Sequence, residues 1–119
     1  MKAALISVSR SLALELASCG VRVNVVTPGP ILTDLHVGPK GAATALGVSN
    51  EEYVGGIEAE APVRRIGHPD EVASMVVALL SPRMGYITGA DVVVDGGELA
   101  SILDRLSSFG NSGIYSSDS

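Results

Sequence analysis

The chain has 119 residues and a formal net charge of −5. Its largest basic cluster is Arg64-Arg65, so the positive surface of a nucleic-acid-binding protein is absent and no nucleic-acid partner is predicted. No stretch approaches the roughly 20 apolar residues of a membrane span, and no secretory signal is visible. We therefore expect a soluble cytoplasmic protein without a membrane partner. The single cysteine, Cys19, is interpreted as a small buried apolar side chain rather than a reactive thiol.

Residues 1–18 carry the strongest helical pattern of the chain. Apolar residues recur there at steps of three and four positions, the period of one helix face. They are Leu5, Val8, Leu12 and Leu16. Ile6, Ala13 and Ala17 widen this face, so the helix is expected to be buried on more than one side. Gly20 is the expected stop, since glycine readily adopts the left-handed conformation at a helix end.

A buried parallel strand is predicted over 21–26, a short β-branched run that Pro28-Gly29-Pro30 brings to an end. An irregular excursion over 34–62 follows, and Ser49 precedes an expected helix start within it. We expect one or two short helices on a mobile segment there. Long connections in compact domains are usually lids, binding loops or disordered segments.

A second helix is predicted over 69–80, because Pro69 suits the first helical position and two acidic residues follow it at the positive end of the helix dipole. Its expected buried face consists of Val72, Met75, Val76, Leu79 and Leu80. A second buried strand is predicted over 91–95. From Glu98 onward four apolar residues allow one or two amphipathic turns, but the Ser/Gly-rich end has little to bury. Residues 98–119 are therefore interpreted as a largely disordered tail.

Six different short motifs are distributed along residues 1–97. They are Lys2-Ala3-Ala4, Val23-Asn24, Pro28-Gly29-Pro30-Ile31-Leu32-Thr33, Arg65-Ile66-Gly67-His68-Pro69-Asp70-Glu71, Tyr86-Ile87-Thr88-Gly89 and Val94-Asp95-Gly96-Gly97. In this order and with these gaps they resemble the C-terminal part of a short-chain dehydrogenase/reductase. The resemblance implies an α/β fold, in which residues 1–97 form the C-terminal part of a doubly wound, Rossmann-like parallel sheet with about two strands and two main helices.

The resemblance also implies roles for five residues, with NAD or NADP as the cofactor. Lys2 lies at the lysine position of the family's Tyr-x-x-x-Lys motif. It would bind the nicotinamide ribose hydroxyls and lower the pKa of the tyrosine, which is ordinarily near ~10. Pro28 and Gly29 would let the backbone approach the nicotinamide ring. The Ile31 main chain would bind the carboxamide, and the Thr33 hydroxyl would bind the carboxamide or the pyrophosphate.

Other parts of the family's site fall upstream of Met1: the Gly-rich phosphate loop, the catalytic serine and the tyrosine. We therefore expect weak or no cofactor binding and no turnover by this chain alone, and a gene model truncated at an internal methionine would account for the start. Asp95-Gly96-Gly97 is interpreted as a structural turn. His36 and His68 are far from any Cys/His cluster, so no metal site is predicted.

Three hypotheses about function follow. The leading one is the C-terminal part of an NAD(P)-dependent oxidoreductase that moves a hydride between the cofactor and an alcohol or ketone, with residues 34–62 covering the substrate. The second is a non-catalytic interaction module, since the first helix of family members commonly pairs with its symmetry mate. Such a chain would form a homo-oligomer or pair with a full-length paralogue. The third is the product of a truncated or mis-assigned gene.

Overall fold

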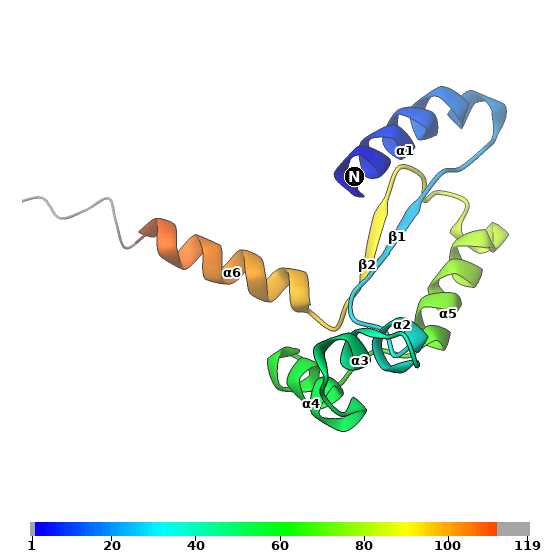
Figure 1. Cartoon of the computed structure of the whole chain (residues 1–119). Coiled ribbons are helices and arrows are strands. Elements are labelled where there is room, and N and C mark those ends of the chain that lie inside the picture. Colours follow the sequence, from blue (N-terminus) through cyan, green and yellow to red (C-terminus); the bar gives the residue numbers. More distant parts are fainter. Residues whose placement is uncertain (1, 112–119) are drawn as a thin grey trace, which may run out of the picture.

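The computed structural model describes residues 2–111, which contain six α-helices and a two-stranded sheet (Figure 1). The α-helices are α1 (Lys2–Leu16), α2 (Asp34–Val37), α3 (Ala42–Leu46), α4 (Asn50–Glu60), α5 (Pro69–Leu80) and α6 (Glu98–Asn111). The strands are β1 (Val25–Pro28) and β2 (Asp91–Val94), and short 3-10 helices η1 (Ala17–Cys19) and η2 (Pro82–Met84) follow α1 and α5. The predicted α/β architecture is confirmed.

Helix α1 forms as its periodicity predicts, but it is not buried as expected. Gly20 ends the helical segment in the left-handed conformation, with φ of 73°, and its N–H donates to the Ala17 carbonyl at 3.0 Å. Ala13 is the one buried residue of α1, at 2% exposure, whereas Leu5 is 62% and Leu14 is 82% exposed. The interpretation of Cys19 as a buried side chain was wrong, because it lies exposed in η1.

The two strands run parallel, with Val25 opposite Asp91 and Pro28 opposite Val94. The first strand was predicted over 21–26, so its position is shifted toward the C-terminus. Both strands were predicted to be buried, but their residues are half-buried or exposed. The reason for the shift lies in residues 22–24, which pair with the end of α5 and the loop before β2 through side chains as well as backbone. The guanidinium of Arg22 donates to the Leu79 and Ile87 carbonyls at 2.7 and 3.1 Å. The backbone N–H of Val23 donates to the Thr88 hydroxyl, so no regular ladder forms there.

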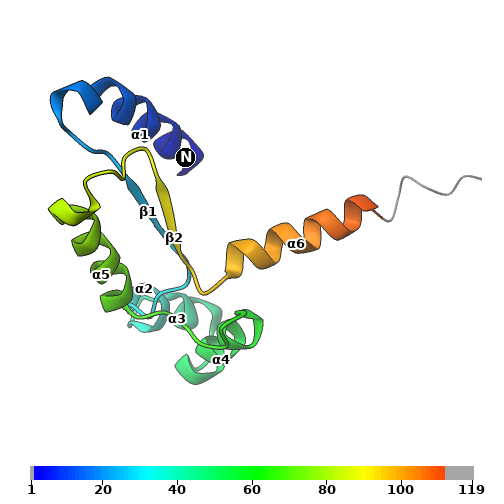
Figure 2. The same ribbon diagram turned by 180° about the vertical axis from the view of Figure 1, so that it is seen from behind.

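The ends of the sheet face different parts of the chain. Figures 1 and 2 both show α1 near the amino-terminal ends of the strands. Helices α2, α3 and α4 and the start of α6 lie at the carboxyl ends, and α5 runs beside β1. This arrangement places the turn after β1 next to the excursion, at the sheet edge where α/β proteins bind ligands.

The excursion is more regular than expected, because it contains three helices rather than one or two. Ser49 caps α4 as predicted, since its hydroxyl accepts the N–H of Glu52 at 3.1 Å. The side chains of His36 in α2 and Tyr53 in α4 meet at 3.1 Å between Nδ1 and the phenolic oxygen. These contacts connect helices that are too short to be stable alone.

Helix α6 corrects the expectation of a largely disordered tail over 98–111. The carboxylate of Asp95 accepts the N–H groups of Gly97 and Leu99, both at 2.8 Å, and so organises the helix start. Gly96 and Gly97 adopt positive φ values of 63° and 89° in this turn, which fits its interpretation as structural. Residues 112–119 of the expected tail lie outside the described residues.

Little of this fold is buried. Ala13, Ala43 and Ile66 are the buried hydrophobic residues of the described part. The expected buried face of α5 is wrong, because no residue of this helix is buried. Val72, Met75 and Leu79 are half-buried, and Val76 and Leu80 are 41% and 75% exposed. The accessible surface is 8832 Å², against about 6,000 Å² for a compact monomer of this mass. The chain is therefore an open arrangement of elements around a small sheet.

Candidate nicotinamide-binding site

The candidate site begins where β1 ends, at the turn from Pro28 to Thr33. Gly29 donates its N–H to the Val94 carbonyl of β2 at 3.0 Å. A Cβ atom at Gly29 would lie 2.6 Å from the Cβ and 2.8 Å from the Cα of Asp95. The glycine is thus required by the close approach of the β2 end, in addition to any role toward a ligand.

Ile31 has backbone groups that are available to a ligand. It forms an isolated parallel bridge with Gly67, in which Leu32 donates to the Gly67 carbonyl at 2.8 Å and Gly67 donates to the Pro30 carbonyl at 3.0 Å. Both bonds use the peptide groups that flank Ile31. Its own N–H and C=O point away from Gly67, as alternation along a strand requires, and make no hydrogen bond within residues 2–111.

Thr33 completes the segment with a side chain that is also available. Its residue is exposed and extended, with φ of −140° and ψ of 170°, and it immediately precedes α2. Its carbonyl accepts the N–H groups of His36 and Val37, but its hydroxyl makes no hydrogen bond to any residue that the structure describes. A hydroxyl in this state can donate to or accept from a bound amide or phosphate.

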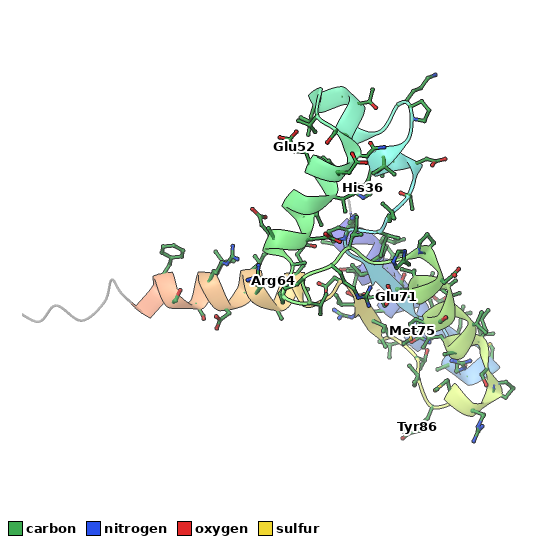
Figure 3. All side chains as sticks on the ribbon, turned by 90° about the horizontal axis from the view of Figure 1, so that it is seen from below. His36, Glu52, Arg64, Glu71, Met75 and Tyr86 are labelled. Atoms are coloured by element: carbon green, nitrogen blue, oxygen red, sulfur yellow. The ribbon has the colours of Figure 1, made fainter. Side chains whose placement is uncertain are left out.

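The returning segment opposite Ile31 is fixed by an ion pair. The Arg65 guanidinium binds both oxygens of the Glu71 carboxylate, at 2.5 and 2.8 Å, and the backbone N–H of His68 donates to the same carboxylate at 2.9 Å. Figure 3 shows Glu71 where α5 meets the carboxyl end of the sheet. The hydrogen bond from Arg65, helped by that from the His68 backbone, lowers the pKa of Glu71 to about 2.

A cavity of about 220 Å³ opens beside this bridge. Ile31, Gly67 and the Arg65–Glu71 pair line one side, and Val94 at the end of β2 lines another. The first two turns of α6 form a further wall. The cavity therefore lies at the carboxyl ends of both strands.

The structure does not bring all predicted site residues together. Pro28, Gly29, Ile31 and Thr33 lie on one continuous turn at the carboxyl end of β1. Lys2 is exposed at the start of α1, which Figures 1 and 2 both place toward the other end of the strands. The catalytic role of Lys2 and the cofactor roles of all five residues remain predictions.

Sequence reasoning missed the contribution of Gly67 and of the Arg65–Glu71 pair. These residues stand in one of the recognised motifs, but nothing local indicates that they contact Ile31, which is more than thirty positions earlier in the chain.

The described residues contain no group of three or more His, Cys, Asp or Glu side chains that could hold a metal ion. None of the helices within 2–111 is long and apolar enough to cross a bilayer.

Known proteins resemble the chain over most of its length. A family model described as enoyl-(acyl carrier protein) reductase matches residues 1–98. The 3-oxoacyl-(acyl-carrier-protein) reductase FabG of Salmonella typhimurium is 44% identical over 96 residues, which are 81% of this chain and 35% of that protein. The chain thus spans about a third or less of the length of the curated relatives it matches.

Solved structures agree with this similarity. A short-chain dehydrogenase family protein from Francisella tularensis superposes with a TM-score of 0.76 at 40% identity, covering 83% of this chain and 41% of that one. YwfH, an NADPH-dependent reductase involved in bacilysin biosynthesis, superposes with a TM-score of 0.71 at 30% identity, covering 81% and 37% of the two chains. The helical segment after residue 98 lies beyond the matched family region.

Proposed function

Because the chain belongs to the short-chain dehydrogenase/reductase family, we propose that it forms the nicotinamide-binding part of an NAD(P)-dependent oxidoreductase acting on an alcohol/ketone pair. The observation that carries the proposal is the pair of available Ile31 backbone groups on the turn after β1. A similar protein of solved structure is NADPH-dependent, which supports a nicotinamide cofactor.

The turn fits one end of such a cofactor. A carboxamide has one donor and one acceptor group, and the Ile31 N–H and C=O together offer the complementary pair. The Thr33 hydroxyl lies two residues further on and can bind the carboxamide or the pyrophosphate. When bound in its reduced form, the cofactor would supply a hydride to the ketone carbon, and in its oxidised form it would accept one from the alcohol carbon. The sequence contains no Gly-x-Gly-x-x-Gly loop to bind the pyrophosphate, so we infer weak binding by this chain alone.

Lys2 would act on proton transfer rather than on hydride transfer. A cationic ammonium group near a tyrosine stabilises the phenolate and lowers its pKa toward neutrality. The tyrosine of the family motif is not among the 119 residues. We therefore infer that the isolated chain does not reduce ketones, and that residues 34–62 cover the substrate only when the rest of the site is present.

The proposal is tested by site-resolved hydrogen exchange of the chain with millimolar nicotinamide mononucleotide. Slower exchange at the amides of Ile31 and Thr33, with no change in β2, supports it. Thr33→Val is the matched variant, because it removes the hydroxyl while keeping the shape of the side chain. The variant is expected to weaken the effect without changing exchange in the sheet. Unchanged exchange at Ile31 in the unmodified chain at saturating ligand would refute the proposal.

A second candidate is a non-catalytic partner of a full-length relative. The observation that favours it is the exposed apolar face of α1, where Leu5, Val8 and Leu12 are 62%, 55% and 41% exposed. Mixing the chain with a full-length family member and measuring co-elution tests this candidate. A complex that forms with the unmodified chain, but not with Leu5→Glu/Leu12→Glu, would support it.

A further inference from the structure

The Ile31–Gly67 bridge closes the base of the excursion. The chain leaves the sheet region after Leu32 and returns at Gly67, and the two backbone hydrogen bonds join these points at 2.8 and 3.0 Å. The excursion also approaches the turn after β2, where Cβ atoms at Gly96 and Gly97 would lie 2.6 Å from Val63 and 3.2 Å from Pro62. At the bridge itself, the hydrogen bonds to Gly67 flank Ile31 and so orient its backbone groups.

Gly67 is held from the side by charged groups. The Glu71 carboxylate receives three hydrogen bonds, two from the Arg65 guanidinium and one from the His68 backbone N–H. These donors come from residues on both sides of Gly67 in the sequence. Arg65 and Glu71 have side-chain exposures of 52% and 40%, so they fix this turn from the surface and not from within a core.

The end of the Ile31 side chain occupies the space next to position 67. A Cβ atom there would lie 2.7 Å from Cδ1 of Ile31 and 3.4 Å from the Pro30 carbonyl oxygen. Its nearest obstacle is thus the end of the Ile31 side chain. An alanine at this position must turn the end of that side chain aside, which disturbs its packing against Gly67 next to the available backbone groups.

We propose that Gly67, fixed by the Arg65–Glu71 ion pair, is a positioning residue that aligns the N–H and C=O of Ile31 for a nicotinamide carboxamide. The inference rests on the proposed function. Gly67 itself does not touch the cofactor. It acts through the two hydrogen bonds that flank Ile31 and through the packing of the Ile31 side chain.

Three variants of the full 119-residue chain test the proposal with nicotinamide mononucleotide as the ligand. Gly67→Ala is expected to weaken ligand protection of the Ile31 amide about tenfold in apparent Kd, and to speed exchange of the Leu32 amide. Gly67→Ala/Ile31→Val removes the obstructing Cδ1 atom. It is expected to restore the ligand protection of the Ile31 amide and the slower exchange of the Leu32 amide. Glu71→Gln releases the clamp without touching the bridge, and is expected to weaken binding while exchange at Val26 and Val92 stays unchanged.

Two controls and three contrary outcomes complete the experiment. Gly56→Ala in α4 has nothing within 4 Å of its new Cβ, and Glu58→Gln removes a carboxylate elsewhere, so both should bind as the unmodified chain does. Equal binding by Gly67→Ala and the unmodified chain would overturn the positioning role alone. No protection of Ile31 in the unmodified chain would overturn the proposed function, and the positioning role with it. If Gly67→Ala does not fold, Glu71→Gln decides: unchanged binding by that variant overturns the positioning role.

Discussion

Gly29 lies where the turn after β1 passes the end of β2. Its N–H donates to Val94, and the space in which a side chain would lie is occupied by backbone and Cβ atoms of Asp95. Backbone atoms cannot rotate away as a side-chain tip can. The Asp95 carboxylate also caps α6, so a displacement at Gly29 would reach that helix. The absence of a side chain at Gly29 thus allows the candidate site, the end of β2 and the start of α6 to lie close together.

We expect Gly29→Ala to destabilise the chain, because its Cβ would approach Asp95 within 2.8 Å. Overpacking of this kind typically costs about 1–3 kcal/mol. Gly55→Ala is the control, since a Cβ there meets nothing within 4 Å and alanine in a helix is favoured by about 1 kcal/mol. Hydrogen exchange at the β1 and β2 amides measures the stability of both variants. Equal exchange in the two variants would contradict the prediction.

We predict that the turn held by the Glu71 carboxylate loosens at acid pH. Its pKa is lowered to about 2 from an ordinary value of 4.5, chiefly by the hydrogen bond from Arg65, so folding favours the ionised form. The stabilisation is fully present above pH 4.5 and is lost as the pH falls through about 2. Exchange of the His68 amide, corrected for its intrinsic pH dependence, should accelerate over this interval. Glu71→Gln should remove the transition, whereas Asp70→Asn should leave it.

At the scale of elements, local signals predicted α1, α5 and the start of α4. The steps of three and four residues in α1, the stop at Gly20 and the start of α5 at Pro69 are properties of short sequence windows, and each is found as predicted. Ser49 also caps α4 as its position indicated. These features depend on hydrogen bonds between near neighbours, which is why sequence patterns report them.

Non-local contacts account for what could not be predicted. The shift of β1 to Val25–Pro28 depends on Thr88 and on Asn24, whose side chain binds the Ile87 carbonyl and the Ala90 N–H across the sheet. The Ile31–Gly67 bridge pairs residues on opposite sides of the excursion. Helix α6 was missed because its second half contains Ser107, Ser108 and Gly110, which have weak helical propensity, while its start depends on Asp95.

The excursion is predicted to exchange its amide hydrogens faster than the sheet does. Helices α2 and α3 have four and five residues, and α4 has no buried residue. Short helices with little burial open readily, so residues 34–62 should exchange faster than the β1 amides. Ser49→Ala removes the cap of α4, which typically costs about 1 kcal/mol, and should speed exchange there further. Protection over 34–62 equal to that of β1 would contradict the lid interpretation.

At the scale of the whole molecule, exposed apolar surface is the main feature. The surface exceeds that of a compact monomer by about 2,800 Å². The radius of gyration is 19.0 Å, against about 13.5 Å for a compact chain of this length. Interfaces of obligate complexes bury surface of this order. Covering four Leu, Val or Ile side chains contributes roughly 6–12 kcal/mol, comparable with the net stability of a domain.

We therefore predict that the purified chain self-associates or requires a partner. On α1, the side chains of Leu5, Leu12 and Leu14 are 62%, 41% and 82% exposed, and both edges of the two-stranded sheet are unpaired within the described residues. Open strand edges and apolar helix faces pair with other chains.

Size-exclusion chromatography with light scattering should show species larger than a monomer at all accessible concentrations. Leu5→Glu/Leu12→Glu should shift this distribution toward smaller species, because it places charge on the apolar face, whereas Ser7→Glu on the polar side should not. A monodisperse monomer with one sharp cooperative thermal transition would show that these residues fold as a self-sufficient domain.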